Sequence, residues 1–121
     1  MDKRKLGSQY EEQAADFLKK QGYRIAERNY RDRSGEIDII GWDGGCLAFI
    51  EVKYRRDAAK GRSLEAVGCQ KQRRISQAAL SYRMKKRISE ETPCRFDVVG
   101  IDRDEITLVK NAFDFSYGRA W

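Results

Sequence analysis

Two carboxylates and a lysine lie in segments whose other residues are mostly apolar. Asp38 is flanked by isoleucine on both sides, and Glu51 and Lys53 end the apolar run that begins at Cys46. Because side chains alternate along a strand, Glu51 and Lys53 would share one side of it. The Asp43-Gly44-Gly45 segment favours a hairpin that brings Asp38 near Glu51. The sequence therefore predicts a small acidic site where two neighbouring strands end.

Carboxylates placed in this way indicate a hard metal ion. Burying two of them side by side is costly unless a cation offsets their charge. The chain contains no histidine, and its cysteines, Cys46, Cys69 and Cys94, form no C-x-x-C pair. A zinc site is therefore not expected, and Ser-His-Asp and Cys-His mechanisms are excluded. Oxygen ligands alone favour Mg²⁺ or Mn²⁺ as the cofactor.

Glu11 is the third acidic candidate. Its neighbours at helical spacing are Ala14, Ala15 and Leu18, so it lies at the edge of a stripe that should face the sheet. The alternative is a first-turn glutamate that the helix dipole favours, and Glu12 competes for the same role. Similarly, Glu51-Val52-Lys53 could be an ion pair at a sheet edge, although it is the one acidic-x-Lys triplet in the chain.

The elements that must position these residues are predicted from hydrophobic period and turn residues. Helices are expected at 8–21, capped by Ser8 and stopped by Gly22, and at 63–88. Strands are expected at 23–30, 36–42, 46–53, 95–101 and 105–110, and 46–53 is apolar enough to be central. The order α-β-β-β-α-β-β predicts one α/β domain covering residues 1–121.

The apolar stripes of the two helices should cover this sheet. The first is expected to use Tyr10, Ala14, Phe17 and Leu18. The positions expected for the second are Ala66, Val67, Ile75, Ala78, Ala79, Tyr82 and Ile88. In the aromatic tail, packing of Phe113 and Phe115 on the domain is favoured over stacking of Tyr117 or Trp121 on bases or contact with a second subunit.

The charge balance indicates a polyanionic partner. The net charge is +6, from 25 Lys and Arg against 19 Asp and Glu. The cations that follow the acidic site in the chain could form a phosphate-binding rim, made of Arg55, Arg56, Lys60, Arg62, Lys71 and Arg74. No base-reading pattern is present, so backbone or shape recognition is expected.

Nothing in the sequence indicates a membrane protein. No apolar run approaches the roughly 18 residues that a membrane span needs. The basic N-terminal residues lead into a charged helix and not into the apolar stretch of a signal peptide. We therefore expect a cytoplasmic protein with no membrane partner.

The site motifs resemble those of the PD-(D/E)XK nuclease superfamily and, more narrowly, the YraN-like family of small bacterial endonuclease-like proteins, which is similar to archaeal Holliday junction resolvases. The likeness spans nearly the whole chain. It is carried by Gly7, Glu11, Ala14, Asn29, Gly35-Glu36-Ile37-Asp38, Glu51-Val52-Lys53, Lys71 and Arg95-Phe96-Asp97-Val98. One departure is that Ile37 stands where the superfamily pattern has proline.

This resemblance implies a restriction-endonuclease-like mixed sheet flanked by helices and a metal-dependent cut of DNA. It assigns metal binding to Asp38 and Glu51, assistance at the metal to Glu11, and completion of the catalytic motif to Lys53. The resemblance implies a nuclease more firmly than it identifies the substrate, for which branched DNA such as a four-way junction is one candidate, and a homodimer is implied because resolution needs two cuts. The competing hypotheses are a non-catalytic nucleic-acid-binding module on the same fold and a nuclease acting on RNA. The sequence names no partner protein.

Overall fold

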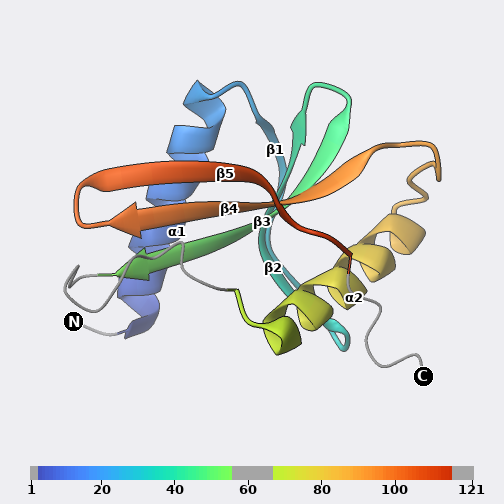
Figure 1. Cartoon of the computed structure of the whole chain (residues 1–121), viewed down its shortest axis with the longest axis horizontal. Coiled ribbons are helices and arrows are strands. Elements are labelled where there is room, and N and C mark those ends of the chain that lie inside the picture. The colour runs from blue at the N-terminus through green and yellow to red at the C-terminus, as the bar shows by residue number, and fades with distance from the viewer. Residues whose placement is uncertain (1–2, 56–66, 116–121) are drawn as a thin grey trace.

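The computed structural model describes residues 3–55 and 67–115, and for residues 3–6 and 55 it describes only the backbone. Its helices and strands follow one another in the predicted order (Figure 1). They are α1 (Lys3–Lys20), β1 (Arg24–Asp32), β2 (Gly35–Asp43), β3 (Cys46–Arg55), α2 (Cys69–Lys85), β4 (Cys94–Asp102) and β5 (Glu105–Phe113). The order α-β-β-β-α-β-β is thus confirmed.

Several boundaries differ from those predicted. Helix α1 begins at Lys3, so Ser8 lies inside it and does not cap it. The prediction failed because the first turns of α1 are charged and carry no apolar period. Gly22 does end α1, with a φ of 98° and a hydrogen bond from its N–H to the Lys19 carbonyl.

The second helix is shorter than predicted. Helix α2 begins at Cys69, after Gly68, whose φ of −63° and ψ of 158° are extended, and it ends at Lys85, before Ile88. Residues 63–66 of the predicted helix lie outside the described part of the chain. At the first hairpin, β1 continues through Asp32, two residues into the segment predicted as a turn.

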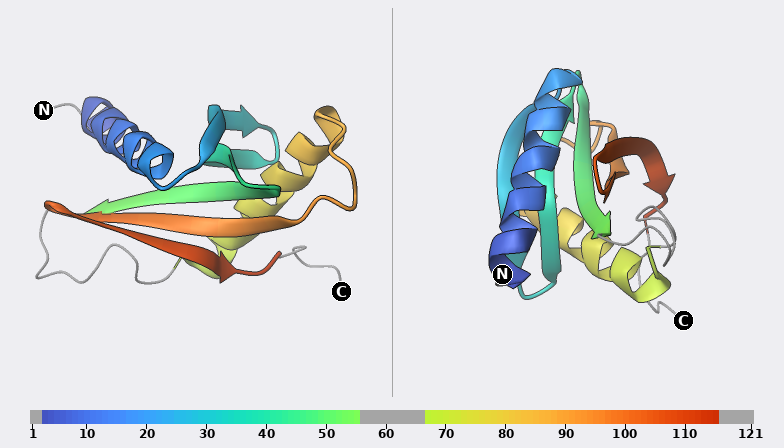
Figure 2. Two further views of the ribbon diagram at one scale, coloured as in Figure 1. Left: turned by 90° about the horizontal axis from the view of Figure 1, so that it is seen from above. Right: turned by 90° about the vertical axis from the view of Figure 1, so that its left-hand side faces the viewer.

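The five strands form one mixed sheet in the order β1-β2-β3-β4-β5. Strands β3 and β4 pair in parallel, and the other neighbours pair antiparallel. A parallel pair needs a long crossover, and α2 lies in the connection from β3 to β4. Figure 2 shows β3, β4 and β5 running side by side. The central position predicted for β3 is confirmed.

The two faces of the sheet carry separate cores. On the α1 side, Ala48, Ile50 and Val52 of β3 pack with Ala14, Ala15 and Leu18. On the α2 side, Leu47 and Phe49 pack with Ile75, Ala78, Ala79 and Tyr82. The sheet is therefore flanked by helices, as predicted. Neither helix in the described ranges has the length and apolar character needed to cross a membrane.

The stripes were predicted with some errors. Ala15, and not Phe17, joins the buried face of α1. Of the residues predicted for α2, Val67 and Ile88 pack against the core from outside the helix, and Ala66 lies outside the described residues. Phe113 and Phe115 do pack on the domain, with ring centroids 4.9 Å and 4.6 Å from that of Phe96. Tyr117 and Trp121 lie outside the described chain.

Asp32 fastens the β1–β2 hairpin to α2. Its carboxylate accepts hydrogen bonds from the Ser34 N–H (2.8 Å), the Tyr30 hydroxyl (3.0 Å) and the Ser81 hydroxyl, and Lys85 lies 3.3 Å away. Burial alone would raise the pKa of Asp32, but these hydrogen bonds outweigh it and hold the pKa well below its ordinary value of 3.8. The hairpin is therefore held beside α2 by an ionised carboxylate.

The substitution Asp32→Asn should lower the free energy of unfolding at pH 7 by about 1 to 2 kcal/mol, because hydrogen bonds to a charged acceptor are lost. A lowered pKa in the folded state contributes stability above the ordinary pKa, and this contribution is lost as the pH falls below it. The difference between wild type and variant should thus shrink below about pH 4. Urea unfolding between pH 7 and pH 3 measures it.

Asp104→Asn, in the exposed β4–β5 turn, is the matched control and should show no such difference. A wild-type minus Asp32→Asn difference that stays constant over the whole pH range would contradict the role given to Asp32.

Candidate active site

The site lies where β2 and β3 stop pairing. Starting from the Gly44-Gly45 turn, the hairpin register runs from Asp43↔Cys46 to Ile39↔Ile50. The next residues on the two strands are Asp38 and Glu51. Here the Asp38 carboxylate accepts a hydrogen bond from the Val52 N–H, at 2.8 Å. A side chain thus takes the place of a backbone partner, and the hairpin brings the two acids together as predicted.

A hydrogen bond between the two carboxyl groups raises the pKa of Glu51 and lowers that of Asp38. Glu51 is only 5% exposed. Burial, and then the negative charge of Asp38, raise the pKa of Glu51 to about 8, although Lys71 opposes the shift. Burial likewise raises the pKa of Asp38. Both raised pKa values mean that it is costly in this fold for the pair to carry two negative charges.

Lys71 approaches the pair from α2. Its Nζ lies 3.1 Å from Oε2 of Glu51. Burial would lower the pKa of Lys71, but the attraction of Glu51 raises it. The sequence predicted Lys71 as a phosphate contact, and the structure gives it a second position that sequence reasoning missed, as the cation beside Glu51. No pattern in the sequence linked residue 71 to residue 51.

Glu11 approaches from α1, on the other side of the sheet. It is half-buried, and burial followed by the charge of Asp38 raises its pKa, while Arg28 and a hydrogen bond from Asn29 lower it. Glu12 points elsewhere: it is exposed and pairs with Arg28 at 2.7 Å. Of the two competing glutamates, Glu11 is therefore the one whose charge interacts with Asp38.

Asn29 is a site residue to which the sequence assigned no role. It has a φ of 53° in the middle of β1, a conformation that asparagine tolerates better than most residues. From this position its side chain hydrogen-bonds to Glu11. An asparagine inside an alternating strand is the signal that could have indicated it, since asparagine is depleted in strands.

A second buried carboxyl group shows by contrast what is unusual about this pair. Asp97 is fully buried and accepts hydrogen bonds from the Tyr23 hydroxyl (2.7 Å), the Arg95 guanidinium (2.9 Å) and the Asn111 N–H (2.9 Å). These three partners are all donors, and none of them is an acid. Asp97 is thus a satisfied structural carboxylate, whereas Asp38 and Glu51 oppose each other.

The donor chemistry of the Asp38–Glu51 pair fits a hard divalent cation, because it offers carboxylate oxygens and no nitrogen or sulfur. Across residues 3–55 and 67–115, no group of three or more acidic or cysteine side chains could hold a metal ion. Two carboxylates suit Mg²⁺, which commonly takes one or two and completes its shell with water and phosphate oxygens. Direct ligation by Glu11 stays a prediction. Lys53 follows Glu51 on β3 and is partly exposed.

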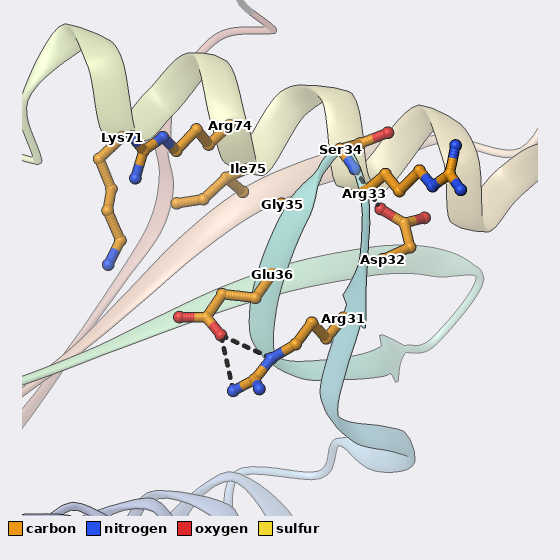
Figure 3. Close-up of a pocket in the computed structure, with 9 residues that line it drawn as sticks. All are labelled: Arg31, Asp32, Arg33, Ser34, Gly35, Glu36, Lys71, Arg74 and Ile75. Atoms are coloured by element: carbon orange, nitrogen blue, oxygen red, sulfur yellow. Dashed lines mark hydrogen bonds and ion pairs between the residues drawn. The ribbon is translucent and has the colours of Figure 1, made fainter.

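The predicted basic rim is only partly described. Arg56, Lys60, Arg62 and the side chain of Arg55 lie outside the described part of the structure. Lys71 and Arg74 line a cavity of about 440 Å³ between α2 and the β1–β2 hairpin. Figure 3 shows both side chains extending from α2 toward the side where Glu36 extends from β2.

Comparison with known proteins places this chain among relatives of the same length. The model of an uncharacterised protein family, UPF0102, matches residues 10–101. A UPF0102 protein of Lachnoclostridium phytofermentans is 52% identical over 118 residues, covering 98% of this chain and 99% of its own. A UPF0102 protein of Trichlorobacter lovleyi is 48% identical, with 93% and 92% covered. One from Coxiella burnetii is 42% identical, with 93% and 95% covered.

Two substitutions should move stability in opposite directions when divalent ions are removed with EDTA. Glu51→Gln should raise the free energy of unfolding at pH 7.5, on the order of 1 kcal/mol, because an amide cannot ionise beside Asp38 and can still donate a hydrogen bond to it. Lys71→Gln should lower it, because the cation that offsets the pair is removed. Urea unfolding of both variants and the wild type measures the two shifts.

A Glu51→Gln protein that is less stable than the wild type in EDTA would contradict this account. It would mean that Glu51 contributes to the fold as a favourable ion pair, and that its proximity to Asp38 carries no cost.

Proposed function

The chain belongs to the uncharacterised family UPF0102, the YraN-like family, and from its site we propose that the protein is a divalent-metal-dependent endonuclease that hydrolyses phosphodiester bonds in DNA. The family name carries no activity, so the proposal depends on the arrangement of this chain's own residues. The proposal extends to the kind of DNA that is cut, for which four-way junctions are the candidate.

The observation that carries it is the hydrogen-bonded pair of Asp38 and Glu51. The pair is partly to fully buried, opposed in charge by one lysine, and formed at the position where one strand loses its backbone partner. A fold selected for stability alone would gain by replacing one of the two acids. Perturbed acids clustered in this way are typical of functional sites.

A bound Mg²⁺ or Mn²⁺ would be held by Asp38 and Glu51. Glu11 would assist, because the charge of Asp38 acts on it. When bound, such an ion supplies Lewis acidity, which activates water and offsets the charge of a phosphoryl group. The net charge of the whole chain, +6, suits a polyanionic substrate.

The remaining steps belong to the chain's own groups. Water attacks phosphorus, the bond from phosphorus to the leaving sugar oxygen breaks, the attacking water loses a proton to solvent, and the leaving oxygen takes up a proton from solvent. We assign to Lys53 the orientation of that water or the offset of charge developing on the phosphate. Lys71, whose Nζ lies 3.1 Å from Glu51, would offset part of the charge of the pair when no divalent ion is bound. Asn29 positions Glu11 through its hydrogen bond.

The resemblance to PD-(D/E)XK nucleases supports the same assignment. Asp38 followed thirteen positions later by Glu51-Val52-Lys53 matches the order of that motif across a hairpin. A mixed five-stranded sheet with a helix on each face agrees with the fold that the resemblance implies. The absence of proline before Asp38 does not alter the carboxylate arrangement.

Two observations favour the alternative, a nucleic-acid-binding module without catalysis. No acidic group of three or more that could hold a metal was found in the described ranges, and Lys71 already neutralises part of the pair's charge. A binding module would use the basic surface and leave the acids without a role. A cleavage assay distinguishes the nuclease from the binding module.

The wild-type protein should cut labelled DNA in Mg²⁺ or Mn²⁺ and not in EDTA. The substitutions Asp38→Asn and Glu51→Gln should each reduce cleavage by roughly 100-fold or more, because losing a metal ligand costs at least as much as losing its supporting groups. Linear duplex, single strand, four-way junction and RNA are compared in one assay, so that the preferred substrate is measured together with the metal dependence.

Glu12→Gln is the matched control, since Glu12 is exposed and its charge is directed to Arg28, and this variant should cut normally. Binding without cutting in every metal would overturn the nuclease proposal in favour of the binding module. Cleavage that survives in both Asp38→Asn and Glu51→Gln would overturn the site assignment.

A further inference from the structure

The cavity between the β1–β2 hairpin and α2 has an excess of positive charge. We call it the hairpin–helix cleft, and it is lined by Arg31, Asp32, Arg33, Ser34, Gly35, Glu36, Lys71, Arg74 and Ile75. Four of these residues are cationic and two are acidic. Residues 31–35 fall between two predicted strands and were not among the residues predicted for the phosphate-binding rim, so the hairpin side of this cleft was missed.

The acids of the cleft are already engaged. Asp32 accepts a hydrogen bond from Ser81 and forms an ion pair with Lys85, and neither of these residues lines the cleft. Glu36 pairs with Arg31, with 3.1 Å between Oε2 and the nearer terminal guanidinium nitrogen. What remains are two arginines, Arg33 and Arg74, that form no ion pair with any side chain in the described ranges. Guanidinium groups suit phosphate because they can donate two parallel hydrogen bonds to it.

The cleft adjoins the carboxylate pair. Lys71 lines the cleft and also lies 3.1 Å from Glu51, and Glu36 is two residues before Asp38 on β2. Figure 3 shows Lys71 and Arg74 around Ile75 at one end, with Arg33 beside Asp32 at the other. Cations are thus distributed along α2, starting at the candidate active site and leading away from it.

The shape of the cleft is fixed by the fold. Asp32 ties the hairpin to α2, and Gly35 allows the hairpin to come close to the helix. A Cβ atom at Gly35 would lie only 2.6 Å from the carbonyl oxygen of Arg74. The backbone that carries Arg33 and the backbone that carries Arg74 are therefore held at a set separation. A preorganised cleft of this kind loses less entropy when it binds a ligand.

We propose that the hairpin–helix cleft binds the phosphates that neighbour the scissile phosphate on the same nucleic-acid strand, with Arg74 on the nearer one and Arg33 on a farther one. This inference rests on the proposed function and adds the path of the strand to it. The path runs from the Asp38–Glu51 pair, past Lys71 and along α2. Contacts of this type fix the position of the backbone and read no base sequence.

The test is the salt dependence of binding to a short labelled DNA duplex in EDTA, where no cutting takes place. Arg74→Gln and Arg33→Gln should each weaken binding and reduce the slope of log K against log salt concentration by about 0.9, the value for one lost phosphate contact. Arg83→Gln is the matched control, because Arg83 lies on the same helix and lines a different cavity. It should bind with the wild-type slope.

Unchanged slopes in both Arg74→Gln and Arg33→Gln would overturn the cleft, as would an equal loss in Arg83→Gln, which would indicate general charge attraction. These outcomes are independent of catalysis. If the wild type cuts DNA but both cleft variants bind normally, the cleft alone is wrong. If the wild type never cuts but the cleft variants lose binding, the nuclease proposal is wrong and the phosphate contacts stand.

Discussion

The candidate site depends on the approach of two carboxyl groups, Asp38 and Glu51, at the point where the pairing of β2 with β3 ends. The strands pair from the Gly44-Gly45 turn up to Ile39↔Ile50, and then an aspartate side chain takes the next backbone N–H. Burial raises the pKa of both acids, and the negative charge of Asp38 raises that of Glu51 further. A satisfied acid such as Asp97 shows that this fold can bury a carboxylate at low cost. The charge of the pair is offset in part by Lys71, which lies 3.1 Å from Glu51.

Both helices bring side chains to this pair, and they do so from opposite faces of the sheet. Helix α2 brings Lys71 to Glu51, while α1 brings Glu11 toward Asp38, where Asn29 holds it from a strained position in β1. The same anchoring of the hairpin by Asp32 and Gly35 that places β2 also forms the basic cleft beside it. The basic cleft thus results from the packing of the β1–β2 hairpin against α2, and it lies beside the acidic site because β2 also carries Asp38.

Much of this could be predicted from the sequence, because the decisive signals are local. The alternation of β3 and the position of the Asp43-Gly44-Gly45 turn predicted that Asp38 would meet Glu51, and the order of elements followed from their periods. Contacts between distant segments could not be predicted in the same way. The pairing of Lys71 with Glu51, the role of Asn29 and the hairpin side of the cleft depend on how α1 and α2 pack. The start of α1 at Lys3 was missed because its first turns lack an apolar period.

The central claim is that Asp38 and Glu51 are kept together to bind a divalent cation, and titration calorimetry with Mn²⁺ tests it most directly. The account predicts saturable binding to the wild type and to Glu12→Gln, and binding at least tenfold weaker in Asp38→Asn and Glu51→Gln, as expected when a ligand is lost. Mn²⁺ binding that is equal in the wild type and both site variants, or absent from the wild type, would contradict it. The measurement needs no substrate, so its result is independent of which nucleic acid the protein cuts.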